Sequence, residues 1–127
     1  MKDMRSEAGS WTWFIFAGIV VFVLLGLHML IIHMDGILGI FNPAGGSALS
    51  WDNVIARSHS GFFAVTYIIL LAAALYHGFY GLRTIIFELG LKKQCQRCWT
   101  VTLWIVGIVL FIVGTYAAIA VQSVKAV

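Results

Sequence analysis

Long apolar runs dominate the pattern along the chain. Three of them, at about 11–33, 60–82 and 99–121, each hold roughly 20 residues with few or no charges, enough to cross the ~30 Å hydrocarbon core of a bilayer. They predict three transmembrane helices. The first run is too long for the core of a signal peptide and ends in MLIIHMDG instead of a small-x-small cleavage site, so we expect it to remain as a helix.

The second helix is predicted to extend beyond its membrane span of 60–82. Ser50 can cap a helix N-terminus, and Asp52 then lies in the first turn, where its negative charge suits the helix dipole. Gly90 supplies a C-terminal stop. One helix over about 50–89 is therefore expected to project past the bilayer.

The composition is typical of a membrane protein. Hydrophobic residues make up 61% of the chain and charged residues only 10%, with a mean hydropathy of +0.98. No internal repeat or low-complexity tract marks a second domain. Residues 1–127 are expected to form a single all-α integral membrane domain with three transmembrane helices. Because three helices make an incomplete bundle, we expect them to be part of a larger multi-subunit one.

Lysine and arginine are distributed unevenly about these spans. Six of the eight lie in the N-terminal tail and the 83–98 connection: Lys2, Arg5, Arg83, Lys92, Lys93 and Arg97. The positive-inside rule then places the N-terminus in the cytoplasm and the C-terminus outside, in an inner or cytoplasmic membrane. The net charge of +3 thus reflects topology and gives no support for nucleic-acid binding.

Two histidines, His28 and His77, fall inside the apolar runs, where ionisable residues are functional by default. At ~1.5 Å per residue, His28 lies near the outer boundary and His77 near the inner one, about 18 Å apart in depth. Both axial nitrogens of a bis-histidine haem lie about 2 Å from one iron, comparable to zinc–histidine bonds. These two histidines therefore cannot ligate the same haem, and each would need a partner from elsewhere.

The surroundings of His77 favour ligation. Its near neighbours on the helix are small, which would let a flat macrocycle approach: Ala73, Ala74, Gly78 and Gly81. Arg83, about one and a half turns on, could reach a carboxylate such as a haem propionate. The alternative is a histidine that only hydrogen-bonds a neighbouring helix.

The other histidines are weaker candidates for haem ligands. His28 is surrounded by Leu and Ile on its own face, so a ligand role and a structural role are equally open. His33 and His59 lie at the outer interface, where a histidine costs little. On a continuous helix, however, His59 is five full turns before His77 and shares its face, which keeps it as a reserve candidate for an outer haem.

The run LYHGFYGLRTIIFELG, followed by a basic connection and a third helix, resembles the His-x-x-x-Gly-x-(basic)-x-x-x-x-acidic pattern of the membrane-anchor subunits of succinate dehydrogenase and fumarate reductase (complex II). The resemblance covers about residues 70–120. It implies that His77 is an axial ligand of haem b, shared with a second membrane-anchor subunit. It also implies a flavoprotein subunit, an iron–sulfur subunit and a quinone site.

Two departures from the family pattern bear on the site. The family has Asp-Tyr at the inner end of this helix, where the tyrosine helps to bind quinone, whereas this chain has Glu88-Leu89. The Ser-x-x-His-Arg-x-Ser-Gly motif of the sister subunit is absent from residues 1–12, and ARSHSG at 56–61 is only loosely similar to it. The chain therefore resembles the subunit without that motif, and its histidines in helices 1 and 2 resemble those of two-haem members.

The expected function is that of a cytochrome b anchor of a succinate:quinone or quinol:fumarate oxidoreductase, which relays electrons between an iron–sulfur partner and quinone. His77 would bind the haem iron, as His28 would in an outer haem, while Arg83 and Arg57 would neutralise propionates. Quinone would bind near the inner ends of helices 2 and 3, in reach of Tyr80, Arg83 and Glu88. The basic inner face of Lys92, Lys93 and Arg97 would dock the iron–sulfur subunit. Dicarboxylate oxidation would belong to the partners, because this chain has no flavin motif and no cysteine set for iron–sulfur clusters.

Two other functions remain open. Cys95 and Cys98 have the spacing of a redox-active disulfide, but the charge distribution places them on the reducing side, and a metal site would need two further ligands. They are expected to be two small residues at the start of helix 3. A haem-free anchor that only packs on its partners is the other alternative, because Gly107 and Gly114 form a helix-packing seam.

Overall fold

The computed structural model describes residues 2–33, 46–47, 49–90 and 92–123, and all regular secondary structure among them is helical. Side chains are described from Glu7 onward. The helices are α1 (Lys2–His33), α3 (Trp51–Ser58), α4 (Gly61–Glu88) and α5 (Lys93–Ala120), followed by a 3-10 turn, η1 (Val121–Ser123). The predicted fold class is confirmed.

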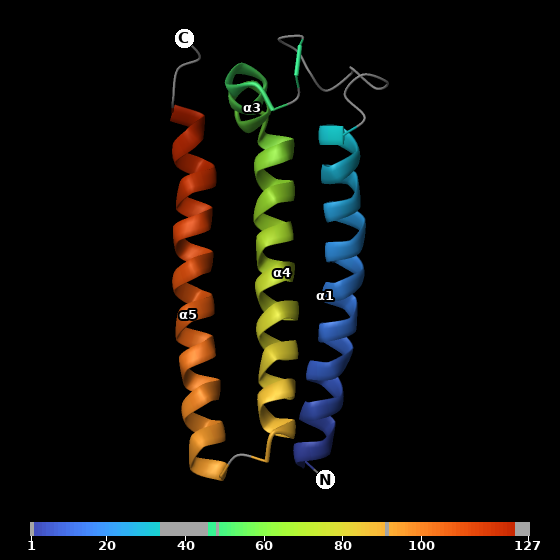
Figure 1. The fold of residues 1–127 in the computed structure, drawn as a ribbon, viewed down its shortest axis with the longest axis vertical. Coiled ribbons are helices and arrows are strands. Elements are labelled where there is room, and N and C mark those ends of the chain that lie inside the picture. The colour runs from blue at the N-terminus through green and yellow to red at the C-terminus, as the bar shows by residue number, and fades with distance from the viewer. Residues whose placement is uncertain (1, 34–45, 48, 91, 124–127) are drawn as a thin grey trace.

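The three long helices stand side by side in one layer, with α4 in the middle (Figure 1). Each is long and apolar enough to cross a membrane, over Glu7–His33, Gly61–Glu88 and Lys93–Ser123. The N-terminus and the α4–α5 connection lie at one end of the layer, here named the N-terminal end. The C-terminus and α3 lie at the opposite, C-terminal end. The N-terminus and the α4–α5 connection therefore lie at the same end and the C-terminus at the other, as the sequence predicts.

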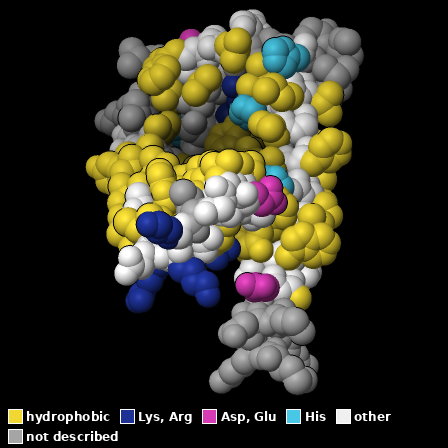
Figure 2. Space-filling model, turned by 60° about the horizontal axis from the view of Figure 1, so that its bottom comes forward, with side chains coloured by type: hydrophobic (Ala, Val, Ile, Leu, Met, Phe, Trp, Pro, Cys, Tyr) yellow, Lys and Arg dark blue, Asp and Glu magenta, His cyan; other side chains and the backbone are white. Residues whose placement is uncertain are grey.

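Close helix contacts occur where glycine removes a side chain. A Cβ on Gly107 would lie 3.0 Å from the Phe79 ring, and a Cβ on Gly114 would lie 2.5 Å from a methyl of Leu71. Both glycines belong to α5 and face α4, as the predicted seam requires. Few side chains are fully covered, and the surface is largely hydrophobic (Figure 2).

The prediction of one helix over 50–89 is wrong. The chain bends at His59 and Ser60, where Ser60 has an extended backbone (φ −78°, ψ 119°) and starts α4. The bend lays α3 across the end of α4, where it appears nearly end-on in Figure 1, and it buries Asn53 and Ile55. A straight helix would have left these two side chains in solvent. His59 therefore does not share a helix with His77, and the five-turn register between them does not apply.

The predicted helix ends are present. The Ser50 hydroxyl accepts a hydrogen bond from the backbone N–H of Asn53 at 3.4 Å, as an N-cap does. Gly90 follows α4 with φ +73°, a left-handed conformation that side chains disfavour, and its N–H donates to the Phe87 carbonyl.

Candidate functional site

His77 lies between α4 and α1, at the level of Phe14 and Gly18. Its ring stacks on the Phe14 ring with centroids 4.3 Å apart and an interplanar angle of 3°. The ring fits because residue 18 is glycine: a Cβ there would lie 2.9 Å from Cε1 and 3.0 Å from Nδ1. Two residues of α1 thus fix both the tilt and the depth of the imidazole.

The hydrogen bond of His77 determines its tautomer. Nδ1 lies 3.1 Å from the backbone carbonyl oxygen of Phe14. A carbonyl oxygen can only accept, so Nδ1 carries the hydrogen, and in a neutral ring Nε2 keeps its lone pair. Metal-binding histidines are usually oriented in this way, by donating the other ring N–H to a carbonyl or carboxylate.

The small residues around His77 have two different roles. Gly81 faces α1, where a Cβ would lie 3.4 Å from the Phe14 ring, so this space is filled within the chain. A Cβ on Gly78 would meet nothing within 4 Å, and Ala74, one turn away, is exposed. Ala74 and Gly78 therefore form a small-residue surface beside His77 that a flat ring system or a partner helix can approach.

Arg83 lies on the flank of α4 that faces α5, and the structure does not bring it to His77. Its Nε donates to the Thr100 hydroxyl at 3.3 Å, and its guanidinium carbon lies 4.4 Å from the centre of the Phe87 ring. The Thr100 hydroxyl in turn donates to the Gln96 carbonyl. These contacts hold the guanidinium at the N-terminal end of the α4–α5 contact.

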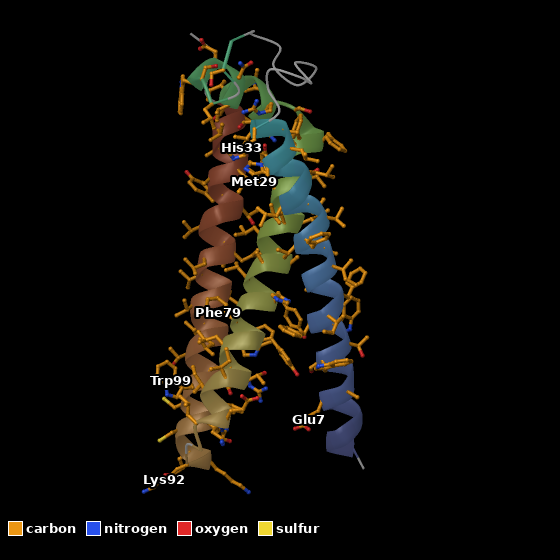
Figure 3. The ribbon with its side chains drawn as sticks, turned by 45° about the vertical axis from the view of Figure 1, so that its right-hand side comes forward. Glu7, Met29, His33, Phe79, Lys92 and Trp99 are labelled. Carbon is orange, nitrogen blue, oxygen red and sulfur yellow. The ribbon has the colours of Figure 1, made fainter. Side chains whose placement is uncertain are left out.

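The three residues expected to contact quinone line one hollow at the N-terminal end. It lies between α1 and α4, whereas the sequence placed the site at the second and third long helices, α4 and α5. Tyr80, Arg83 and Glu88 contribute from α4, and the α1 side includes Glu7 and Trp11. In Figure 3, Glu7 projects from the side of α1 near its start. Sequence reasoning missed both α1 residues as members of the site. Their spacing of four, which places them on one helical face, was the available signal.

At the C-terminal end, His28 lies near Arg57, which the sequence had assigned to propionates. The His28 ring makes an edge-to-face contact with Tyr67 of α4 at 5.6 Å between centroids, and Arg57 of α3 is close enough to act on it electrostatically. Arg57 is only 6% exposed, whereas His59 is exposed. Tyr67 is ten residues before His77, or ~15 Å along α4. This agrees with the separation of about 18 Å expected between the two histidines.

Cys95 and Cys98 are exposed free thiols in the first two turns of α5. Among the described residues, no three His, Cys, Asp or Glu side chains gather as a metal site would require. Lys92, Lys93 and Arg97 are exposed at the same end, where Figure 2 shows the basic side chains in dark blue.

Comparison with known proteins gives a consistent result. The family model of succinate dehydrogenase/fumarate reductase transmembrane subunits matches residues 3–118. The succinate dehydrogenase hydrophobic membrane anchor subunit of Thermoplasma acidophilum is 23% identical over 104 residues, which cover 82% of this chain and 78% of that protein. No solved structure matches the chain.

Proposed function

The chain belongs to the family of succinate dehydrogenase/fumarate reductase transmembrane subunits, and from this membership we propose that it binds haem b and relays electrons between an iron–sulfur subunit and membrane quinone. Its three candidate spans make it a multi-pass membrane-anchor subunit. The proposed partners are an iron–sulfur subunit, a flavoprotein subunit and a second membrane anchor. The N-terminal end, with its excess of Lys and Arg, would face the cytoplasm.

The hydrogen bond from His77 to the Phe14 carbonyl carries the proposal. It leaves Nε2 as the nitrogen with a lone pair, and the ring is fixed before any ligand binds. His77 would hold the haem iron from one side, with the other axial ligand supplied by the second anchor. Haem there would supply a one-electron carrier, and the open surface at Ala74 and Gly78 has the small residues that a macrocycle needs.

A second haem at the C-terminal end is proposed because His28 lies inside an apolar span and Arg57 of α3 lies at the same end of the layer. His28 would be the ligand, and the buried guanidinium would neutralise a propionate. His59 is the weaker candidate, because the bend before α4 separates it from the face of His77.

Quinone would bind in the hollow between α1 and α4. Tyr80 and Arg83 can donate hydrogen bonds to a quinone oxygen, and the Glu7 and Glu88 carboxylates lie where protons enter from the N-terminal end. This role suits Arg83 better than binding a propionate of a haem at His77, because Arg83 lines the hollow and the structure does not bring it to His77.

Replacing the proposed ligand tests the haem assignment directly. In the purified complex, His77→Ala is expected to remove one haem b per copy of this chain, as measured by the pyridine haemochrome assay and the reduced-minus-oxidised spectrum. His33→Ala, an exposed histidine at the C-terminal end, is the matched control and should keep the wild-type haem content. An unchanged haem content and reduction potential in His77→Ala would instead favour the haem-free anchor, in which the Phe14 bond only joins two helices.

A further inference from the structure

A groove runs along the contact between α4 and α5, on the flank of α4 that carries Arg83. It encloses about 260 Å³ and is open along one side. Its walls are apolar over most of its length, with Leu75 and Phe79 on α4 and Leu103 and Phe111 on α5. The stretch from Ala72 to Arg83 on the α4 wall corresponds to ~16 Å of helix.

The groove and the quinone hollow meet. Tyr80 and Arg83 line both of them, so the two spaces adjoin at these polar residues. Beyond this junction, one space leads to Glu7 and Glu88 at the N-terminal end, and the other leads into the apolar layer. Together they form a track with a polar end and an apolar end.

We propose that the α4–α5 groove binds the isoprenoid tail of the quinone whose ring occupies the hollow between α1 and α4. This inference rests on the proposed quinone function and adds the tail site to it. A membrane quinone has the same two-part chemistry, a ring that accepts hydrogen bonds and a long apolar chain. The open side of the groove lets the chain enter from the bilayer and leave without passing through the protein.

Local packing fixes two of the side chains that line the groove. Phe79, seen at mid-height in Figure 3, fits over Gly107 with its ring 3.0 Å from the position of a Cβ, which holds the ring against the α5 backbone. Arg83 is held to Thr100 and Phe87 and so stays at the polar end. The tail would therefore contact side chains whose positions are fixed by packing within this chain.

Obstructing the apolar end tests the tail site. In the purified complex, succinate-driven reduction is measured with a tail-less benzoquinone and with its decyl-tailed counterpart. Ala72→Trp, which fills the far end of the groove, is expected to raise KM at least tenfold for the decyl quinone and to leave KM and kcat for the tail-less quinone unchanged. Tenfold corresponds to about 1.4 kcal/mol, which is less than the burial of two methylene groups contributes.

Control variants distinguish obstruction of the groove from a general effect of adding a tryptophan. Ile112→Trp adds the same side chain at an exposed α5 position outside the groove and should change neither KM. If Ala72→Trp does not assemble, Ile108→Trp obstructs the groove from α5. An equal change for both quinones, or no change, would overturn the tail site and assign the groove to lipid or a partner helix. If the wild-type complex reduces neither quinone while succinate still reduces an artificial dye, the quinone function itself fails, and the tail site with it.

Discussion

At the scale of single residues, the position of His77 depends on a residue of another helix that has no side chain. Gly18 leaves room for the imidazole, and the carbonyl that the ring binds is that of Phe14, one turn earlier on α1. The Phe14 ring then covers the imidazole face. Orientation of a ligand by a backbone carbonyl is robust, because no single side-chain replacement removes the acceptor. It is sensitive instead to anything that moves the ring away from α1.

Gly18→Ala should therefore weaken haem binding without touching the ligand. The new methyl would lie about 2.9 Å from Cε1 of His77, so we expect the ring to shift and its bond to the Phe14 carbonyl to weaken. Loss of such an orienting bond typically costs about 10–100-fold in affinity for a metal group. Haem retained per chain after dilution or competition with apomyoglobin measures the effect. Gly26→Ala, where a Cβ meets nothing within 4 Å on the same helix, is the control. Equal haem retention in the two variants would show that the Gly18 notch does not orient the ligand.

At the scale of helices, α4 is the element on which the layer is built, since both α1 and α5 contact it. Its contact with α5 depends on shape rather than on charge. Leu71 fills the space over Gly114 and Phe79 fills the space over Gly107, so two bulky residues of α4 lie in two notches of α5. In a bilayer, where apolar burial gives no advantage over lipid, such close packing is a main source of helix association.

Gly114→Leu should loosen the α4–α5 pair. A Cβ at this position would lie 2.5 Å from a Leu71 methyl, so Leu71 must move to admit the new side chain. Overpacking of this kind costs about 1–3 kcal/mol of stability. The midpoint of SDS-induced unfolding of this chain in the purified complex should fall accordingly. Gly26→Leu adds the same side chain to open space on α1 and should leave the midpoint unchanged. Equal midpoints would mean that α4 and α5 are held together by other contacts.

The helices show how far the sequence could predict this fold. Apolar runs, the Ser50 cap and the Gly90 stop are local signals, and the structure contains all three spans and both helix ends. The bend at His59 and Ser60 has only a short local signal, the pair Ser60-Gly61. The direction of the bend, which buries Asn53 and Ile55, depends on contacts between elements. In the candidate site, Tyr80, Arg83 and Glu88 line one hollow, as expected from their position at the inner end of this helix, but the helix that completes it is α1 and not α5. Arg83 and His77 are separated because α5 contacts the flank of α4 that carries Arg83 and α1 contacts the flank that carries His77. A single sequence does not specify which flank each neighbouring helix covers.

At the scale of the whole molecule, the single layer of three helices has two broad faces that no other described part of the chain covers. Large apolar side chains line them, among them Phe22 at 81% and Tyr116 at 73% exposure. Lipid can cover such faces, and so can the helices of a second anchor subunit. The open surface at Ala74 and Gly78 lies beside His77, which gives a partner helix access to the level of the proposed haem.

Charge distinguishes the two ends of the layer and predicts where the soluble subunits bind. Lys92, Lys93 and Arg97 are exposed at the N-terminal end. Replacing all three by glutamate would place like charges against an acidic docking surface, which costs several kcal/mol in protein interfaces. We expect the triple variant to lose the iron–sulfur and flavoprotein subunits in pull-downs at low salt, with a dissociation constant raised at least tenfold.

A salt titration and a control variant test whether the soluble subunits bind at the N-terminal end. The difference from wild type should shrink as the salt concentration approaches ~1 M, where the Debye length falls to about 3 Å. Gln122→Glu with Ser123→Glu adds negative charge at the C-terminal end and should leave binding unchanged. If this control instead releases the soluble subunits and the triple variant retains them, the docking surface lies at the C-terminal end. The assignment of the quinone hollow to the end that receives electrons would then be reversed as well, because hollow and basic residues share one end of the layer.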